Sequence, residues 1–217
     1  MRTMQKNPDT LYYSPGAASM AVHWLLIELD RPYRLALVDT QAGQQKSPEY
    51  LALNPNGVVP TLVIDGVPRF EVSALLMTLA DEDPWHRLAP VPDSALRAEY
   101  VQWMFHLANA VQPLLRLWWY PQEAAGEAQR EAVRAHTQPR IEAAWQRLDD
   151  RLAKQGPYLL GDAPSAADLY LTMLLRWTRD MPRPGDSWPH LGELARLMKA
   201  RPTFAELYAR EGLEAWR

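Results

Sequence analysis

The sequence predicts an α/β domain followed by an all-helical domain, and three observations lead to this division. Over residues 10–82, short β-type runs alternate with helical periodicity in the order β-α-β-α-β-β-α. Residues 83–92 are rich in proline and interrupt both periods, as a linker does. Over residues 93–217, every periodic stretch has helical spacing. Residues 1–9 then form an N-terminal tail.

The first half of the α/β domain has the pattern of a β-α-β unit. Thr10–Tyr13 is a short β-type run, and a helix follows it with apolar residues on one face (Val22, Leu25, Leu26 and Leu29). Tyr33–Val38 is the next strand, and Ser47-Pro48 opens a brief helix through Leu53. A β-α-β unit implies two parallel strands with a right-handed crossover.

Residues 54–73 predict a turn, a β-hairpin and the entry to a helix. Asn54-Pro55-Asn56-Gly57 has strong turn chemistry, and the hairpin dipeptide Asp65-Gly66 follows the strand Thr61–Ile64. The Val59-Pro60 bond is either an ordinary trans bond at the entry of a strand or a cis bond. A cis bond would turn the backbone of the valine outward, as an edge for an extended, peptide-like ligand.

Only helices are predicted after the hairpin. Ala74–Asp81 completes the α/β domain, and an apolar stripe from Leu96 to Trp118 predicts a six-turn helix that Pro113 should kink. A second long helix over residues 125–153 should be interrupted by Pro139. The remaining predicted helices are one that starts at Ser165-Ala166-Ala167-Asp168 and runs through Trp177, residues 189–200 and residues 202–211.

The composition is that of a soluble globular protein. Hydrophobic residues make up 47% and charged residues 23% of the 217 residues, and the net charge of −3 argues against an electrostatic nucleic-acid surface. The absence of cysteine excludes disulfides, thiolate zinc sites and a cysteine nucleophile. No apolar stretch approaches the roughly 20 residues of a membrane span, and residues 1–9 lack a secretion core. A cytoplasmic protein without membrane partners is expected.

Motifs for metal and nucleotide binding do not fit the chain. The five histidines have no spacing typical of a metal helix, so no metal site is expected and each is interpreted as structural or surface-exposed (His23, His86, His106, His136 and His190). Gly156–Gly161 has the glycine spacing of a phosphate loop, but Asp162-Ala163 replaces the required Lys-Ser/Thr.

Two segments remain as candidate sites. The first runs from Tyr12 to Ser19, where a strand leads into a helix N-terminus that suits a thiolate or another anion. Hydroxyl groups of Tyr13, Ser14 or Ser19 could donate to that anion, and the alternative is that the serines only form the turn and cap the helix.

The second candidate segment is Glu71-Val72-Ser73, at the entry to the third helix. Its backbone N–H groups could bind a carboxylate while Glu71 accepts from an ammonium group. The alternative is that Glu71 and Ser73 act only as caps.

Together these pieces resemble the glutathione S-transferase superfamily over nearly the whole chain from about residue 10. The matching pieces occur in family order: Leu11-Tyr12-Tyr13-Ser14-Pro15-Gly16-Ala17, Asn54-Pro55-x-Gly57-x-Val59-Pro60, Glu71 before Leu79-Ala80-Asp81, and Leu160-Gly161-Asp162 with Ser165-x-x-Asp168. The bacterial beta class is the most similar. The resemblance implies a thioredoxin-like N-terminal domain, an all-helical C-terminal domain, a homodimer and a cis Val59-Pro60 bond.

The resemblance also implies roles for particular residues. Val59, before the cis Pro60, would pair with the cysteinyl part of glutathione, and Glu71 would hold the γ-glutamyl end. The family's serine after that glutamate is Val72 here, which keeps the backbone N–H and loses the hydroxyl, and the nearest serine is Ser73.

The chain departs from the beta class at the position of the sulfur. The cysteine that normally follows Ser-Pro-Gly-x is Ala18, and Ser19 matches the serine after it. Phe105 and Gln112 occupy the positions of an asparagine and a histidine that point toward the sulfur. Lys46 is the candidate for a basic residue that helps to bind glutathione.

The expected function is therefore that of a glutathione transferase of the kind active in detoxification, with glutathione as cosubstrate and no tightly bound cofactor. Tyr13, Ser14 or Ser19 would stabilise the thiolate, which would attack a small apolar electrophile. That electrophile would lie in a pocket of the helical domain formed by Met104, Leu107, Val111 and Trp118. The alternative is a non-catalytic or altered-ligand binding protein, which Val72 and Ala18 favour.

Overall fold

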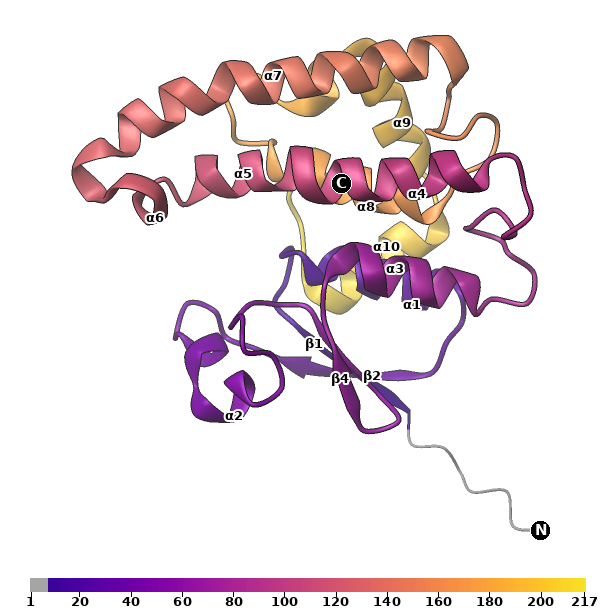
Figure 1. The fold of residues 1–217 in the computed structure, drawn as a ribbon, viewed down its shortest axis with the longest axis horizontal. Helices are drawn as coiled ribbons and strands as arrows, with labels where there is room; N and C mark the ends of the chain where they lie inside the picture. Colours follow the sequence, from indigo (N-terminus) through magenta and orange to yellow (C-terminus); the bar gives the residue numbers. More distant parts are fainter. Residues whose placement is uncertain (1–7) are drawn as a thin grey trace. The chain divides into compact units, whose positions relative to one another are not determined.

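The computed structural model describes residues 8–217, which divide into two compact units (Figure 1). One unit contains the chain up to Pro84 together with Pro202–Ala215, and the other contains Trp85–Arg201 with Trp216–Arg217. The last helix therefore belongs to the first unit, whereas the sequence pattern assigned residues 93–217 to one helical domain. Within residues 8–217, no helix is both long and apolar enough to span a membrane.

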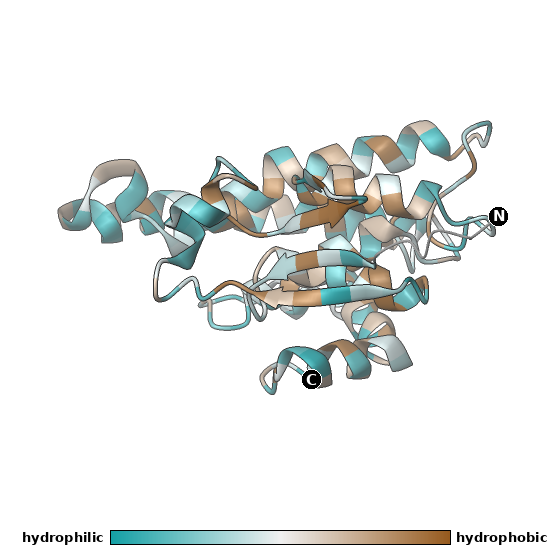
Figure 2. Ribbon diagram, turned by 90° about the horizontal axis from the view of Figure 1, so that it is seen from below, coloured by the Kyte–Doolittle hydropathy of each residue, from teal (hydrophilic) through white to brown (hydrophobic). Residues whose placement is uncertain are grey.

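The first unit is built on a four-stranded mixed sheet in the order β2-β1-β3-β4. β1 (Asp9–Tyr13) pairs in parallel with β2 (Tyr33–Leu37), which confirms the predicted β-α-β unit. β3 (Thr61–Ile64) is antiparallel to β1 and to β4 (Val67–Arg69), and Asp65-Gly66 forms the predicted turn between β3 and β4. Figure 2 shows hydrophobic residues, in brown, along the strands of the fold.

Helices α1 (Ser19–Glu28) and α3 (Val72–Asp81) lie side by side over this sheet (Figure 1). Helix α10 (Pro202–Glu211) packs against α1. The indole N–H of Trp24 in α1 donates to Thr203 Oγ1 at 3.1 Å, and its buried ring lies 5.2 Å from the ring of Phe204. Burial of these aromatic rings explains why α10 joins the first unit.

The long helix predicted from Leu96 to Trp118 contains a π-helical segment between two α-helical segments. α4 (Arg97–His106) is followed by the π-helical segment η2 (Leu107–Val111), and α5 (Gln112–Trp119) continues from there. Pro113 stands in the first turn of α5. A proline cannot donate to the carbonyl four residues earlier and its ring crowds that carbonyl, so the wider turn just before it makes room.

Pro139 does not interrupt its helix, and the predicted interruption is wrong. α6 (Gln122–Ala125) and η3 (Glu127–Gln129) lead into α7 (Arg130–Gln155), which passes through Pro139 unbroken. The carbonyl that loses its donor to this proline belongs to Ala135. Ala135 is exposed, so water can satisfy that carbonyl.

Helix α8 (Ala166–Trp177) is the buried centre of the second unit, as the sequence predicts. Its start has the predicted capping box between Ser165 and Asp168. The Asp168 carboxylate accepts from the backbone N–H groups of Leu159 and Ser165 and from the Ser165 hydroxyl, each at 2.8 Å. One buried carboxylate thus fixes both the helix start and the preceding turn.

The carboxylate of Asp149, in α7, caps the N-terminus of helix α9 (Pro189–Lys199). This helix follows η4 (Gly185–Ser187). The N–H groups of His190 and Leu191 lie in its first turn, so they have no acceptor within the helix. Both donate to Asp149 Oδ1 of α7, at 2.7 and 3.0 Å. This contact joins α7 to the start of α9.

We expect Asp168→Asn to destabilise the protein by about 1–3 kcal/mol, because an amide NH2 would replace one acceptor oxygen and face donors. Burial raises the pKa of Asp168 from 3.8 to about 6. Between these values the native state binds more protons than the unfolded state, so this contribution to stability declines as the pH rises. The destabilisation by Asp168→Asn should therefore be larger at pH 4 than at pH 7 in urea unfolding.

The exposed Asp150 of α7 offers a matched control, because it accepts only from the Gln146 side chain in the same helix. Asp150→Asn should change the unfolding free energy by less than about 0.5 kcal/mol at either pH. An Asp168→Asn effect that is equally small, or that is the same at both pH values, would contradict the role of burial.

Candidate functional site

The register of the sheet gathers the predicted glutathione residues of the first unit at one end of the sheet. The last β1–β3 pair is Tyr12–Thr61, so Ser14 and Val59 each lie two residues beyond it. The corresponding end of the β3–β4 ladder is the pair Leu62–Arg69, so Pro60 and Glu71 each lie two residues beyond it. Neighbouring strands lie about 5 Å apart, so the chain after β1, the chain before β3 and the start of α3 meet there.

The backbone of Val59 forms an open edge at this place. The Val59-Pro60 bond is cis, which confirms what the resemblance implies. Within residues 8–217, the N–H and C=O groups of Val59 make no hydrogen bond. The preceding carbonyl, of Val58, accepts from the Tyr50 hydroxyl at 2.8 Å and from the Asn54 side chain at 2.9 Å. Side chains therefore hold the turn while the edge stays available to a ligand.

Glu71 stands at the N-terminus of α3 without capping it. Its backbone has φ 74° and ψ 112°, and its side chain makes no capping hydrogen bond. The carboxylate is exposed, whereas Val72 and Ser73 in the first turn of α3 are buried. First-turn N–H groups have no acceptor within a helix. An exposed carboxylate and the N-terminal turn of a helix thus stand together, which suits the ammonium and the carboxylate of one amino acid.

The loop between β1 and α1 is closed by Ser19. Its hydroxyl accepts from the backbone N–H of Ser14 and donates to the Ser14 carbonyl, both at 3.2 Å. Ser19 is fully buried, and Ala18 precedes α1 with no side-chain cap. The hydroxyl of Ser19 is therefore used within the loop, which favours the turn-forming interpretation for this serine.

Ser14 and Tyr13 present the two remaining hydroxyls. Ser14 Oγ lies 3.2 Å from Thr40 Oγ1, in the loop after β2. Thr40 was missed in the sequence, although it follows a strand predicted to be parallel to β1, and parallel strands end at the same edge. Burial, and then the charge of Glu211, raise the pKa of the Tyr13 phenol. Tyr13 therefore stays protonated at neutral pH, and its hydroxyl can donate a hydrogen bond to a thiolate.

A buried carboxylate from the last helix supports this loop. Glu211 Oε2 accepts from the Gly16 N–H at 2.8 Å, and Oε1 lies 2.7 Å from Nδ1 of His23 in α1. His23 Nε2 lies 2.8 Å from the hydroxyl of Tyr33, which also accepts from Arg210. No sequence pattern indicates this network, because Glu211 stands 195 residues from Gly16.

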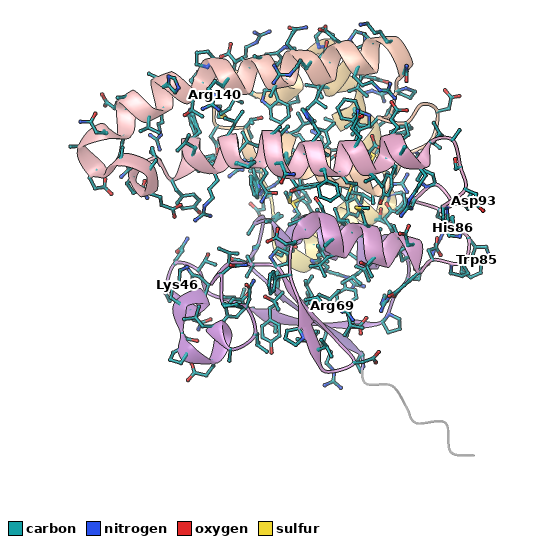
Figure 3. All side chains as sticks on the ribbon, viewed as in Figure 1. Lys46, Arg69, Trp85, His86, Asp93 and Arg140 are labelled. Carbon is teal, nitrogen blue, oxygen red and sulfur yellow. The ribbon has the colours of Figure 1, made fainter. Side chains whose placement is uncertain are left out.

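Lys46 lies beside the turn that precedes Val59 (Figure 3). Its exposed ammonium donates to the backbone carbonyl of Asn56 at 3.3 Å. Gly57 has φ 60°, and a Cβ at this position would lie 2.7 Å from Lys46 Nζ. Glycine is thus required both by the backbone conformation and by the close approach of the lysine.

The predicted pocket residues of the second unit lie along α4, η2 and α5. Met104, Leu107 and Val111 are buried, and Trp118 is half-buried under the guanidinium of Arg134. The pocket itself stays a prediction. A separate cavity of about 320 Å³ is lined by residues of α5, α6, η3 and α7: Leu117, Ala124, Ala125, Gln129, Ala132, Val133, His136 and Thr137.

The resemblance implies that Phe105 and Gln112 occupy the positions that point toward the sulfur in the beta class. Phe105 is exposed, and Gln112 accepts a hydrogen bond from the Tyr170 hydroxyl within the second unit. Among the residues that the structure describes, no group of three His, Cys, Asp or Glu side chains could hold a metal ion.

We expect Glu211→Ala to cost about 3–5 kcal/mol of unfolding free energy, because it removes the buried carboxylate that contacts His23 Nδ1 and accepts from the Gly16 N–H. Glu206→Ala, on the exposed side of the same helix, removes a surface pair with Arg210 and should cost less than about 1 kcal/mol. Urea unfolding of both variants measures the difference. Similar costs for the two would show that the network does not hold α10 and the loop together.

Comparisons with known proteins show the family to which the chain belongs. Residues 17–82 match the family model "Glutathione S-transferase, N-terminal domain", and residues 128–210 match "Glutathione S-transferase, C-terminal domain". Glutathione S-transferase GST-4.5 of Xanthomonas campestris is 36% identical over 171 residues, covering 77% of this chain and 81% of that protein. Glutathione S-transferase GstA of Escherichia coli O157:H7 is 28% identical over 210 residues, covering 94% and 99%.

Solved structures show the same similarity. A glutathione transferase homologue from Sulfitobacter, with bound glutathione, superimposes with a TM-score of 0.87 at 28% identity and covers 95% of this chain and 99% of that one. The fold is that of a thioredoxin-like domain followed by helices, as the sequence predicts. The chain belongs to the glutathione S-transferase family.

Proposed function

We propose that this protein binds glutathione and transfers its thiolate to a small apolar electrophile. The observation that carries the proposal is the convergence of Ser14, Val59 and Glu71 at one end of the sheet. The free N–H and C=O groups of Val59 offer a β-type edge for the cysteinyl part of the tripeptide. The bound glutathione of the Sulfitobacter homologue supports this ligand.

The charges of the site complement the two ends of glutathione. The exposed carboxylate of Glu71 would accept from the γ-glutamyl ammonium, and the first turn of α3, with Val72 and Ser73, would donate to the γ-glutamyl carboxylate. Lys46 would bind the carboxylate at the other end of the tripeptide. The candidate second-substrate pocket along Met104, Leu107, Val111 and Trp118 and the homodimer belong to the same proposal.

Activation of the thiol would rest on donors rather than on a protein nucleophile, since the chain has no cysteine. The start of α1 at Ala18, together with the hydroxyls of Ser14 and Tyr13, would favour the ionised form of the thiol and so lower its pKa. The thiolate would form a C–S bond to the electrophile, and the leaving group would depart with its electron pair.

A second candidate function is that of a binding protein that has kept the scaffold without the reaction. Val72 and Ala18 favour it, because the first removes a hydroxyl from the ligand site and the second removes the beta-class sulfur. Such a protein would bind glutathione or a related peptide and would show no conjugation.

Calorimetric titration with glutathione and a conjugation assay with a chlorodinitrobenzene-type electrophile separate the two functions. We expect binding below millimolar concentration, and turnover above the uncatalysed rate. Binding without turnover would favour the binding protein, and no binding at millimolar glutathione would overturn the proposed function.

The role of Glu71 is tested by Glu71→Gln, which keeps the size of the side chain and removes its charge. We expect glutathione affinity to fall about tenfold or more, because a charge-assisted hydrogen bond contributes roughly 1.5–3 kcal/mol. Glu206→Gln changes an exposed carboxylate elsewhere in the first unit and should leave the affinity unchanged. Equal affinities for the two variants in calorimetry would argue against ammonium binding by Glu71.

Restoring the missing hydroxyl gives a gain-of-function test. Val72→Ser should tighten glutathione binding up to about tenfold through a new hydrogen bond to the γ-glutamyl carboxylate. Val72→Ala is the matched control, because it loses the same buried apolar contacts without adding a hydroxyl. Calorimetry that finds no difference between the serine and alanine variants would place the γ-glutamyl end elsewhere.

A further inference from the structure

The hydroxyl pair formed by Ser14 and Thr40 stands apart from the other polar contacts of the site. The two oxygens lie 3.2 Å apart, and both residues are half-buried. Within residues 8–217, neither side-chain oxygen has another hydrogen-bond partner. A pair of hydroxyls shares one hydrogen, so a second hydrogen remains for a third group. The free edge of Val59, which like Ser14 lies two residues beyond the last β1–β3 pair, marks where that group would bind.

The loop that carries Thr40 is held rigidly by its own side chains. The Asp39 carboxylate accepts from two following backbone N–H groups, at 3.0 and 2.9 Å, and the Asp39 N–H donates to Gln44 Oε1 at 2.8 Å. The side chain of Gln45 donates to the Thr40 carbonyl at 3.3 Å. These contacts hold Thr40 in place before any ligand binds, so its hydroxyl is preorganised.

The other hydroxyls of the first candidate segment are less suited to the thiolate. Ser19 is buried, and its hydroxyl already bonds the Ser14 backbone in both directions. Tyr13 can also donate, but it lies in the field of the Glu211 carboxylate. The titratable groups next to the pair are Tyr13 on β1, Asp39 in the loop and Glu211, which bonds Gly16.

We propose that Thr40 is a positioning residue that donates to Ser14 Oγ and so directs the Ser14 hydrogen toward the glutathione sulfur. The inference rests on the proposed function, because it requires a thiolate at the Val59 edge. The reverse orientation, with Ser14 donating to Thr40, would present oxygen lone pairs to an anion. A chain of hydrogen bonds from Thr40 through Ser14 also polarises each member and strengthens the last bond.

Four variants of the full chain test this arrangement: Thr40→Val, Thr40→Ser, Ser14→Ala and the double variant Ser14→Ala/Thr40→Val. The ultraviolet absorbance of the thiolate in the glutathione complex is followed against pH, together with the pH profile of kcat/KM and the glutathione Kd from calorimetry. Tyr13→Phe is included because the phenol is the competing donor.

In Thr40→Val, which keeps the side-chain shape, the midpoint of thiol ionisation should rise by about half to one pH unit. At a pH below the midpoint, that rise corresponds to about threefold to tenfold less thiolate and a similar loss of kcat/KM, with an unchanged glutathione Kd because glutathione binds there mainly as the thiol. Thr40→Ser should restore the wild-type midpoint. The double variant should match Ser14→Ala, because Thr40 acts only through Ser14.

An unchanged midpoint in Thr40→Val would overturn the inference and leave the proposed function standing. The inference also fails if Thr40→Val changes only the Kd or the unfolding midpoint, as expected for a purely structural contact. It fails as well if Tyr13→Phe shifts the ionisation midpoint while Ser14→Ala does not. If the wild-type protein binds no glutathione at all, the proposed function fails first and the inference with it.

Discussion

The buried carboxylate of Glu211 is the interaction on which the geometry of the candidate site depends. It comes from the end of α10, and it accepts from the Gly16 N–H and contacts His23 in α1. Gly16 has φ 67°, a conformation that glycine adopts without strain, so the loop can turn its N–H inward to the carboxylate. The position of Ser14, two residues earlier, is therefore fixed by a group almost two hundred residues further along the chain.

This dependence explains which parts of the fold the sequence could predict. Hydrophobic patterns, turn residues and capping residues are local signals, so they located the strands around Leu11 and Leu62, the hairpin turn at Asp65-Gly66 and the buried helix after Ser165. The placement of α10 depends on the burial of Trp24 against Phe204 and on Glu211, and no local pattern carries these contacts. Residues 202–211 were for that reason predicted correctly as a helix, whereas the packing of that helix against α1 was not predicted.

The residues of the candidate site also fall into those that local sequence signals reveal and those that depend on contacts within the folded chain. Val59 and Glu71 could be found because a turn before a strand and an acid before a helix are local signals, and the family resemblance supplied the cis bond. The sequence left two uses of Ser19 open, turn formation and anion binding, because a serine at a helix start suits both, and the hydrogen bonds to Ser14 favour turn formation. Thr40 is an intermediate case. Its contact with Ser14 could be predicted once β1 and β2 are known to be parallel, because both residues follow the same end of these strands.

The charges of the first unit limit how a thiolate can be held there. Glu71 and Glu211 are both acidic, and Lys46 is engaged at the turn before Val59. A nearby negative charge opposes ionisation of a thiol, so stabilisation has to come from neutral donors and from the helix N-terminus. The Glu211 charge is directed into the interior, onto Gly16 and His23. In the proposed function, with Ala18 in the place of cysteine, the neutral hydroxyls at the end of β1 are then the side chains that would stabilise the thiolate.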